Sequence, residues 1–241
     1  MKSKFIRTLW GEYDASDKNK HRRKKMEVDI KLLLQNPYKV EFKTYVFGKD
    51  NFSFLQDHGI EDCELIDTKP IVWDMATQQF RHKIEAFKRG IEEFDEIVFL
   101  DWDCQAIKPL PCLFWEKLRE LEKIQAVLRM YKRRKAYWRK KDQRKIPCAS
   151  FVYINDVKVG QDLVDLWENM GKPWSEEIVI MKYMEQLSGG SWKGIDYYWD
   201  NFEPNFFVLD EGYVYEKSLL QTKDLTFKHY NARQVKRKLE G

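Results

Sequence analysis

Strand-like and helix-like patterns of apolar residues alternate along the first hundred residues of the chain. Residues 5–9, 40–47 and 64–67 show the short apolar or alternating runs expected of β-strands. Residues 26–34 are predicted to form a helix, and the polar residues 14–25 before them are expected to form a loop. Such alternation of strands and helices is typical of a doubly wound α/β fold with a largely parallel sheet.

The clearest helix is predicted at residues 77–94. Four of its apolar residues share one face at helical spacing: Phe80, Ile84, Phe87 and Ile91. After Asp95, residues 96–100 (EIVFL) form a continuous apolar run of the kind that is buried on both sides in a parallel sheet. Asn51 is expected to cap a short helix between the second and third strands.

The second half of the chain continues the α/β pattern. It contains expected helices at 113–121, 156–170 and 175–187 and expected strands at 124–128 and 149–154. Neither a Ser/Gly-rich linker nor an internal repeat divides the sequence. We therefore expect one α/β domain over residues 1–241, with a Rossmann-like nucleotide-binding half at 1–103 and a second half at 104–241.

Composition excludes several classes of protein. Nine Trp and 15% aromatic residues exclude a disordered or fibrous chain. The longest apolar runs are too short to cross a bilayer, and the first residues do not resemble a secretory signal. The four Cys form neither a CxxC pair nor a zinc-like spacing, so a reduced, cytosolic protein is expected.

An acidic triplet directly follows the predicted buried strand. Asp101, Trp102 and Asp103 stand where ligands bind in open α/β sheets, beyond the carboxyl ends of the strands. In an extended backbone Asp101 and Asp103 would point the same way and could hold a divalent cation such as Mg or Mn. Such a cation would offset the negative charge on a departing diphosphate. The alternative interpretation is a pair of aspartates that cap a turn.

Four segments resemble the GT-A-fold glycosyltransferases. Residues 94–109 (FDEIVFLDWDCQAIKP) are similar to the DxD region of that family, and residues 149–155 (ASFVYIN) resemble its next strand motif. The acidic helix start at 174–177 and the histidine in 226–230 (TFKHY) also match. Two features depart from the family pattern. Cys148 and Ser150 replace the Asn and Gly that are common in the strand motif, and the Gly-x-x-Lys-Pro-Trp element after the histidine is absent.

The resemblance implies a single GT-A-like domain that transfers a sugar from a nucleotide-diphosphate donor, with a UDP-hexose as the expected donor. The implied acceptor is a carbohydrate or a glycoconjugate: a glycan, a glycolipid or a glycoprotein. The implied cofactor is Mn²⁺, or Mg²⁺, held by Asp101, Asp103 and His229. A neutral imidazole ligand would favour Mn over Mg.

Donor contacts are expected from residues near the strand ends. Arg81 and Lys83 could reach the phosphates or the sugar, and Trp102 belongs to the donor-binding triplet. Trp10 and Tyr13 could stack on the base, and Asp67 could accept hydrogen bonds from the nucleoside. Helix-surface, packing and turn roles are the alternatives for each of them.

Glu176 and Glu177 are the catalytic candidates. One of them could take the proton of an acceptor hydroxyl in an inverting enzyme, or orient the sugar in a retaining one. Both also suit a plain helix start, because acidic side chains favour the positive end of the helix dipole.

The net charge of +4 is small, but residues 129–145 (RMYKRRKAYWRKKDQRK) are strongly basic. This segment could contact an anionic membrane surface, a phosphorylated acceptor or nucleic acid, or form a solvated loop. A nucleic-acid-binding protein is therefore one alternative function. A metal-dependent nucleotidyltransferase, which would use the same carboxylates, is the other.

Overall fold

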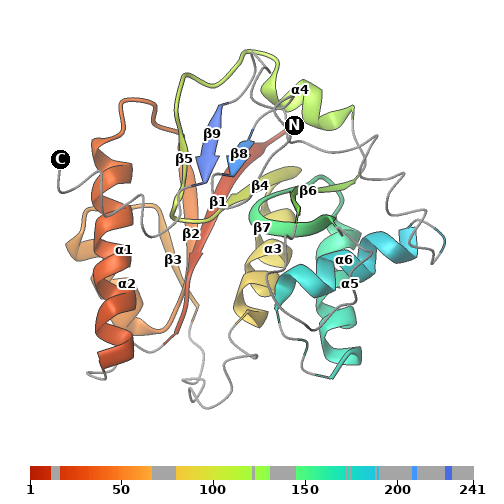
Figure 1. The fold of residues 1–241 in the computed structure, drawn as a ribbon, viewed down its shortest axis with the longest axis horizontal. Coiled ribbons are helices and arrows are strands. Elements are labelled where there is room, and N and C mark those ends of the chain that lie inside the picture. Colours follow the sequence, from red (N-terminus) through yellow and green to blue (C-terminus); the bar gives the residue numbers. More distant parts are fainter. Residues whose placement is uncertain are drawn as a thin grey trace.

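Six strands form the central sheet of the computed structural model (Figure 1), in the order β3-β2-β1-β4-β7-β6. Their bounds are β1 (Ser3–Leu9), β2 (Phe42–Phe47), β3 (Cys63–Ile66), β4 (Glu96–Leu100), β6 (Ile124–Met130) and β7 (Lys145–Ile154). β1 to β4 pair in parallel, whereas β7 is antiparallel to both β4 and β6. The carboxyl ends of the first four strands therefore share one edge, as the sequence predicts.

The structure describes residues 1–11, 17–66, 80–120, 123–130, 145–171, 173, 175–187, 189, 208–210 and 226–229. Two predicted donor contacts, Tyr13 and Asp67, lie outside the described residues, as does most of the basic segment 129–145.

Helices cover both faces of the sheet (Figure 1). α1 (Asp17–Gln35) and α2 (Lys49–Asp57) pack on one face together with the short α4 (Phe114–Arg119). α3 (Arg81–Glu93), α5 (Val157–Asn169) and α6 (Glu176–Leu187) pack on the other. The predicted α/β class is confirmed, with a mixed central sheet. In the described part of the chain, no helix combines the length and the apolar character needed to cross a membrane.

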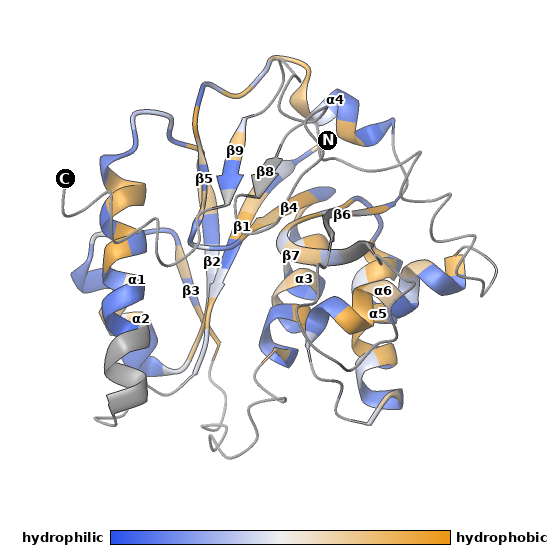
Figure 2. Ribbon diagram, in the orientation of Figure 1, coloured by the Kyte–Doolittle hydropathy of each residue, from blue (hydrophilic) through white to orange (hydrophobic). Residues whose placement is uncertain are grey.

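The apolar patterns produce this arrangement. Every residue of β4 is buried, and the apolar colour in Figure 2 runs along this strand at the middle of the sheet. On α3, the predicted face contributes Ile84, Phe87 and Ile91 to the core. α5 approaches α3 closely at Gly160, where a Cβ atom would lie 2.7 Å from Cγ2 of Ile91. Any larger side chain at Gly160 would push the two helices apart.

A smaller sheet brings distant segments together beside the central one. It contains β5 (Cys104–Ala106), β9 (Phe227–His229) and β8 (Val208–Asp210), in that order. Phe227 anchors it, because its ring lies 5.8 Å from the rings of Phe5, Phe114 and Phe151. This packing places residues 226–229 beside β5, the strand that directly follows the acidic triplet in the chain.

Two local predictions are wrong. Residues 17–25 are helical, as the first part of α1, although we expected a loop. This stretch is rich in Lys and Arg, which favour helices but leave no apolar stripe to detect. Asn51 lies inside α2 and does not cap it, because Gly48 is the N-cap. The Asn51 amide instead donates to the carbonyl oxygens of Gly11 and Phe47, each at 2.8 Å.

Candidate active site

The acidic triplet forms a turn instead of an extended strand. The backbone N–H of Cys104 donates to the carbonyl oxygen of Asp101 at 2.9 Å, which closes the turn. The extended backbone on which the shared direction of the two carboxylates depended is therefore absent, and the triplet forms a turn, as in the alternative interpretation. The backbone N–H of Asp101 donates to the carbonyl oxygen of Ser150 at 2.9 Å, so β7 fixes where the turn begins.

Lys83 on α3 brings two of the other candidate residues together. Its Nζ atom lies 2.8 Å from Oδ1 of Asp101 and 2.9 Å from Oε1 of Glu176. It also donates to the carbonyl oxygen of Ala149 at 3.1 Å, so its three protons all have acceptors. The side chain is only 4% exposed. Lys83 thus joins the acidic turn to the start of α6.

Burial and charge act in opposite directions on Lys83. Burial alone would lower the pKa of the ammonium group, but Asp101 and Glu176 raise this pKa above its ordinary value. Lys83 is therefore a permanent cation at neutral pH. Glu176 is buried, and its second oxygen, Oε2, has no hydrogen-bond partner among the described residues. A buried carboxylate oxygen of this kind can accept a hydrogen bond from a bound hydroxyl group.

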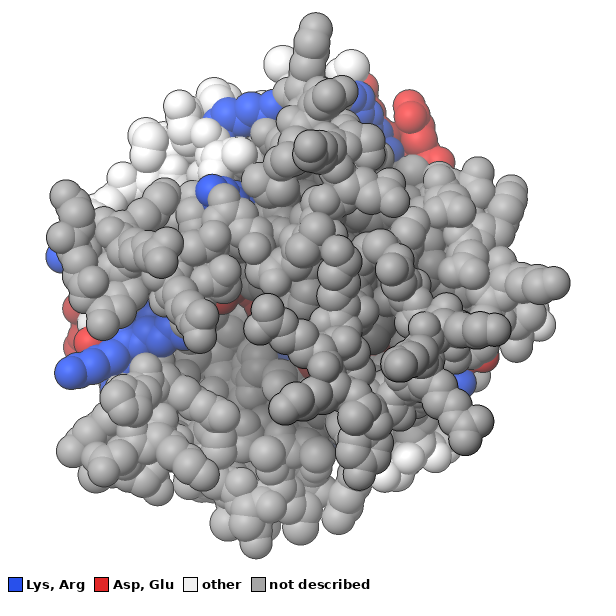
Figure 3. Space-filling view, viewed as in Figure 1, with Lys and Arg blue, Asp and Glu red and all other residues white. Residues whose placement is uncertain are grey.

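The second carboxylate of the turn is held from the opposite side. Nζ of Lys25 on α1 lies 3.0 Å from Oδ2 of Asp103 and 2.6 Å from Oδ2 of Asp29. Asp29 is fully buried, and burial raises its pKa to about 6 although Lys25 opposes the shift. In Figure 3, basic and acidic side chains lie side by side at the edge of the molecule over α1.

Arg7 on β1 lies beneath the turn. Its Nη1 atom donates to the carbonyl oxygen of Asp101 at 2.5 Å, and Nη2 donates to that of Cys104 at 3.2 Å. Burial lowers the pKa of this guanidinium to about 10, with Cys104 and the nearby carboxylates opposing the shift, so it stays charged at neutral pH.

Sequence reasoning missed Arg7, Lys25 and Asp29. A detectable signal existed only for Arg7, which is a charged residue in the middle of the apolar strand FIRTL. Lys25 and Asp29 belong to the stretch around the start of the predicted helix, and nothing in their spacing points to Asp103.

The Trp102 side chain packs into the core. It is 6% exposed, and its indole N–H donates to the carbonyl oxygen of Thr8 at 2.9 Å. Its neighbours are apolar residues of the sheet and α1, including Leu9 and Ile30. This burial gives Trp102 a packing role, and its donor contact stays a prediction.

The remaining candidates surround the turn at different distances. The Trp10 ring lies 5.9 Å from Nζ of Lys83, so it is next to the centre of the site. Arg81 is 38% exposed and pairs with Glu168 at 2.7 Å, which places its charge toward α5. Glu177 follows Glu176 on α6 and is only partly buried.

His229 is placed by its backbone. In the smaller sheet it pairs directly with Cys104, the residue that follows Asp103. Its side chain is not among those described. Among the described side chains, no three His, Cys, Asp or Glu residues converge as metal ligands.

The residues around the turn nevertheless suit a divalent cation. Two carboxylates lie on one tight turn, and a histidine position lies beside it. Oxygen and imidazole ligands of this kind match the preferences of Mn and Mg.

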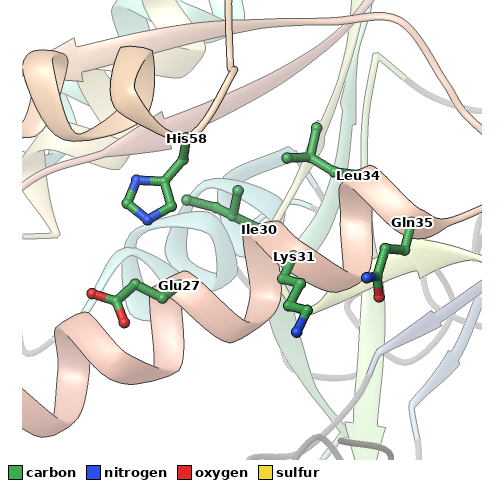
Figure 4. Close-up of a pocket in the computed structure, with 6 residues that line it drawn as sticks. All are labelled: Glu27, Ile30, Lys31, Leu34, Gln35 and His58. Carbon is green, nitrogen blue, oxygen red and sulfur yellow. The ribbon is translucent and has the colours of Figure 1, made fainter.

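A separate hollow lies between α1 and the residue that follows α2 (Figure 4). It is lined by Glu27, Ile30, Lys31, Leu34 and Gln35 of that helix and by His58 after α2. None of the predicted site residues lines it.

Comparison with known proteins supports the fold. No protein-family model and no curated protein matches the sequence. Among solved structures, the chain is similar to a glycosyltransferase involved in the glycosylation of the major capsid of PBCV-1. The match has a TM-score of 0.50 and 9% sequence identity and covers 100% of both chains. The protein therefore has, over its whole length, a fold that a glycosyltransferase also has.

Proposed function

We propose that this protein is a metal-dependent glycosyltransferase that moves a sugar from a nucleotide-diphosphate donor to a carbohydrate or glycoconjugate acceptor. One observation carries the proposal: Asp101 at the end of β4 and Glu176 at the start of α6 meet on the buried ammonium of Lys83. Open α/β sheets bind their ligands at this edge. The fold shared with a glycosyltransferase supports the same reaction class.

Asp101, Asp103 and His229 are the proposed holders of Mn²⁺ or Mg²⁺. When bound, the cation supplies positive charge that stabilises the departing nucleoside diphosphate. Lys25 and Lys83 add fixed positive charge on the two sides of the turn. A bound diphosphate brings negative charge close to the carboxylates that pair with these lysines. The two ammonium groups reduce the repulsion between the diphosphate and those carboxylates.

Glu176 is the proposed catalytic or orienting carboxylate. Lys83 fixes its Oε1 atom, while Oε2 has no partner within the described structure and can accept a hydrogen bond from a sugar or acceptor hydroxyl. Glu177 is the second candidate for this role. Whether Glu176 takes a proton or only orients the sugar decides between inverting and retaining transfer.

The proposed donor is a UDP-hexose. Its diphosphate would lie near Lys83 and Arg81, and its base and ribose near Trp10, Tyr13 and Asp67. The basic segment 129–145 is proposed to contact a phosphorylated acceptor or an anionic membrane surface from the cytoplasm, because lysine and arginine runs bind such surfaces electrostatically.

The experiment is a donor screen with the full chain. Thermal shifts are measured with a panel of nucleotide sugars, each with and without Mn²⁺, and the best donor is then incubated with the protein. Release of free nucleoside diphosphate supports glycosyl transfer or donor hydrolysis. A nucleotidyltransferase would instead release pyrophosphate when it is given a nucleoside triphosphate and a sugar phosphate. Salt-dependent binding of oligonucleotides without any donor shift would indicate a nucleic-acid-binding protein.

A further inference from the structure

Arg7 is a deeply buried charged group beneath the acidic turn. Its residue is 1% exposed, and its guanidinium reaches both ends of the turn through the carbonyl oxygens of Asp101 and Cys104. The Asp101 carbonyl thus accepts two hydrogen bonds, one from Arg7 and one from the backbone N–H of Cys104. Both bonds favour the same closed shape of the turn.

Aromatic rings hold the guanidinium in place. Its Cζ atom lies 4.9 Å from the centre of the Phe42 ring and 5.4 Å from that of the Trp102 ring. Trp102 is itself fixed by its hydrogen bond to Thr8 on the neighbouring part of β1. A planar guanidinium both stacks on rings and spans two acceptors, whereas a lysine ammonium is a single point of charge.

Charge gives a second reason for an arginine here. Asp29, Asp101 and Asp103 all act on Arg7 electrostatically, and three carboxylates in one place repel one another. Lys25 and Lys83 contact the carboxylates from two sides, and Arg7 adds a third cation from beneath. Unlike the lysines, Arg7 donates to the carbonyl oxygens of the turn itself and not to its carboxylates.

We propose that Arg7 is a positioning residue of the active site, whose guanidinium fixes the shape of the acidic turn and thereby the placement of the Asp101 and Asp103 carboxylates. Its role in donor binding rests on the proposed function, whereas its effect on the turn does not. A residue that only stabilises the fold would leave both the local opening of the turn and the affinity of folded protein for metal unchanged.

The test compares Arg7→Met and Arg7→Lys with Arg119→Met. Arg119 is the control because it is another arginine that bonds buried oxygen atoms, those of the Glu96 carboxylate at 3.0 and 3.1 Å from its Nε, but at the opposite end of β4. Hydrogen exchange is followed at the Cys104 amide, which closes the turn. Binding of UDP with Mn²⁺ is measured by calorimetry on the folded fraction of each protein.

We expect faster exchange of the Cys104 amide in both Arg7 variants and not in Arg119→Met. Affinity for UDP with Mn²⁺ should fall by about 10-fold or more in Arg7→Met, as for other residues that orient metal ligands. Arg7→Lys keeps the charge and should fall between the wild type and Arg7→Met.

Unchanged exchange at Cys104 in a folded Arg7 variant would overturn the proposal, as would equal loss of affinity in Arg119→Met. If the wild-type protein bound no nucleotide at all, the proposed function would fail. The exchange measurement would still decide the role of Arg7 in that case.

Discussion

Nζ of Lys83 lies 2.8 Å from Oδ1 of Asp101, although the whole of β4 separates α3 from the acidic turn along the chain. The same ammonium bonds Glu176, so a single buried cation joins a helix, a strand end and a second helix. Removal of Lys83 would leave two carboxylates facing each other without a counter-charge. This arrangement makes Lys83 both a stabilising residue and a part of the candidate site.

Lys83→Met should lower the free energy of unfolding by about 3–5 kcal/mol, because loss of one partner leaves buried charge uncompensated. The folded pKa of Lys83 lies above its unfolded value, so its contribution is complete at neutral pH. It is lost only as the pH rises through the folded pKa. Urea unfolding at pH 7 measures the change.

Lys88→Met is the control for Lys83→Met on the same helix. Lys88 pairs with Glu92 one turn away at the surface, and loss of such a pair costs only about 0.3–0.5 kcal/mol. Equal destabilisation by the two substitutions would show that the buried contacts of Lys83 do not matter.

Asp103→Ala should abolish Mn²⁺-dependent binding of UDP and leave the fold intact. The carboxylate is a proposed metal ligand. Removal of a residue that only orients such a ligand already lowers metal affinity by about 10–100-fold. Calorimetry with UDP and MnCl₂ measures the loss, and circular dichroism checks the fold. Asp57→Ala, at the exposed end of α2, is the matched control and should bind normally. Wild-type affinity in Asp103→Ala would exclude this residue from the metal site.

His229→Ala should reduce affinity for Mn²⁺ more than affinity for Mg²⁺. Its backbone lies opposite Cys104, and an imidazole ligand favours Mn over the harder Mg. Titration of the UDP complex with each metal gives the ratio of the two affinities. His58→Ala, beside the hollow on α1, should leave that ratio unchanged. An equal ratio in His229→Ala and the wild type would remove His229 from the ligand set.

Asp29 should make stability depend on pH in the direction opposite to that of a carboxylate whose pKa is lowered by folding. Its folded pKa of about 6 lies above the ordinary value of 3.8, so the folded state binds the proton more tightly. Stability therefore rises as the pH falls from above 6 toward 4. Asn at this position does not titrate, so Asp29→Asn should lose this dependence.

Urea unfolding of Asp29→Asn and the wild type at pH 4.5 and pH 7.5 tests the effect. The free energy of unfolding of Asp29→Asn, taken relative to that of the wild type, should be higher at pH 7.5 than at pH 4.5 by up to about 3 kcal/mol. Asp57→Asn should show no such change relative to the wild type. A difference that is constant across this range would mean that the pKa of Asp29 is not raised by folding.

The sequence was informative wherever apolar periodicity decides the structure. The EIVFL run predicted a strand buried on both sides, and β4 is buried throughout. The face of α3 that holds Ile84 and Phe87 was likewise predicted from helical spacing. Lys83, Asp101 and Glu176 were each named as candidates, and the structure brings all three together.

Contacts between side chains from distant elements were not predictable. Lys25 reaches Asp103 because the basic start of α1 is helical, and no apolar stripe marks that start. The Trp102 side chain lies in the core and the triplet forms a turn, whereas the argument from alternating side chains requires an extended backbone. Both outcomes depend on tertiary packing, which a local pattern does not encode.

The pairing of β9 with β5 has a consequence for how the site is completed. The parallel strands β1 to β4 can assemble from the first hundred residues, whereas Cys104 meets His229 only after the chain has been synthesised beyond residue 229. A nascent chain would therefore hold the assembled parallel strands before the proposed metal site is complete. In the proposed enzyme, activity would begin only once β9 had docked beside the turn.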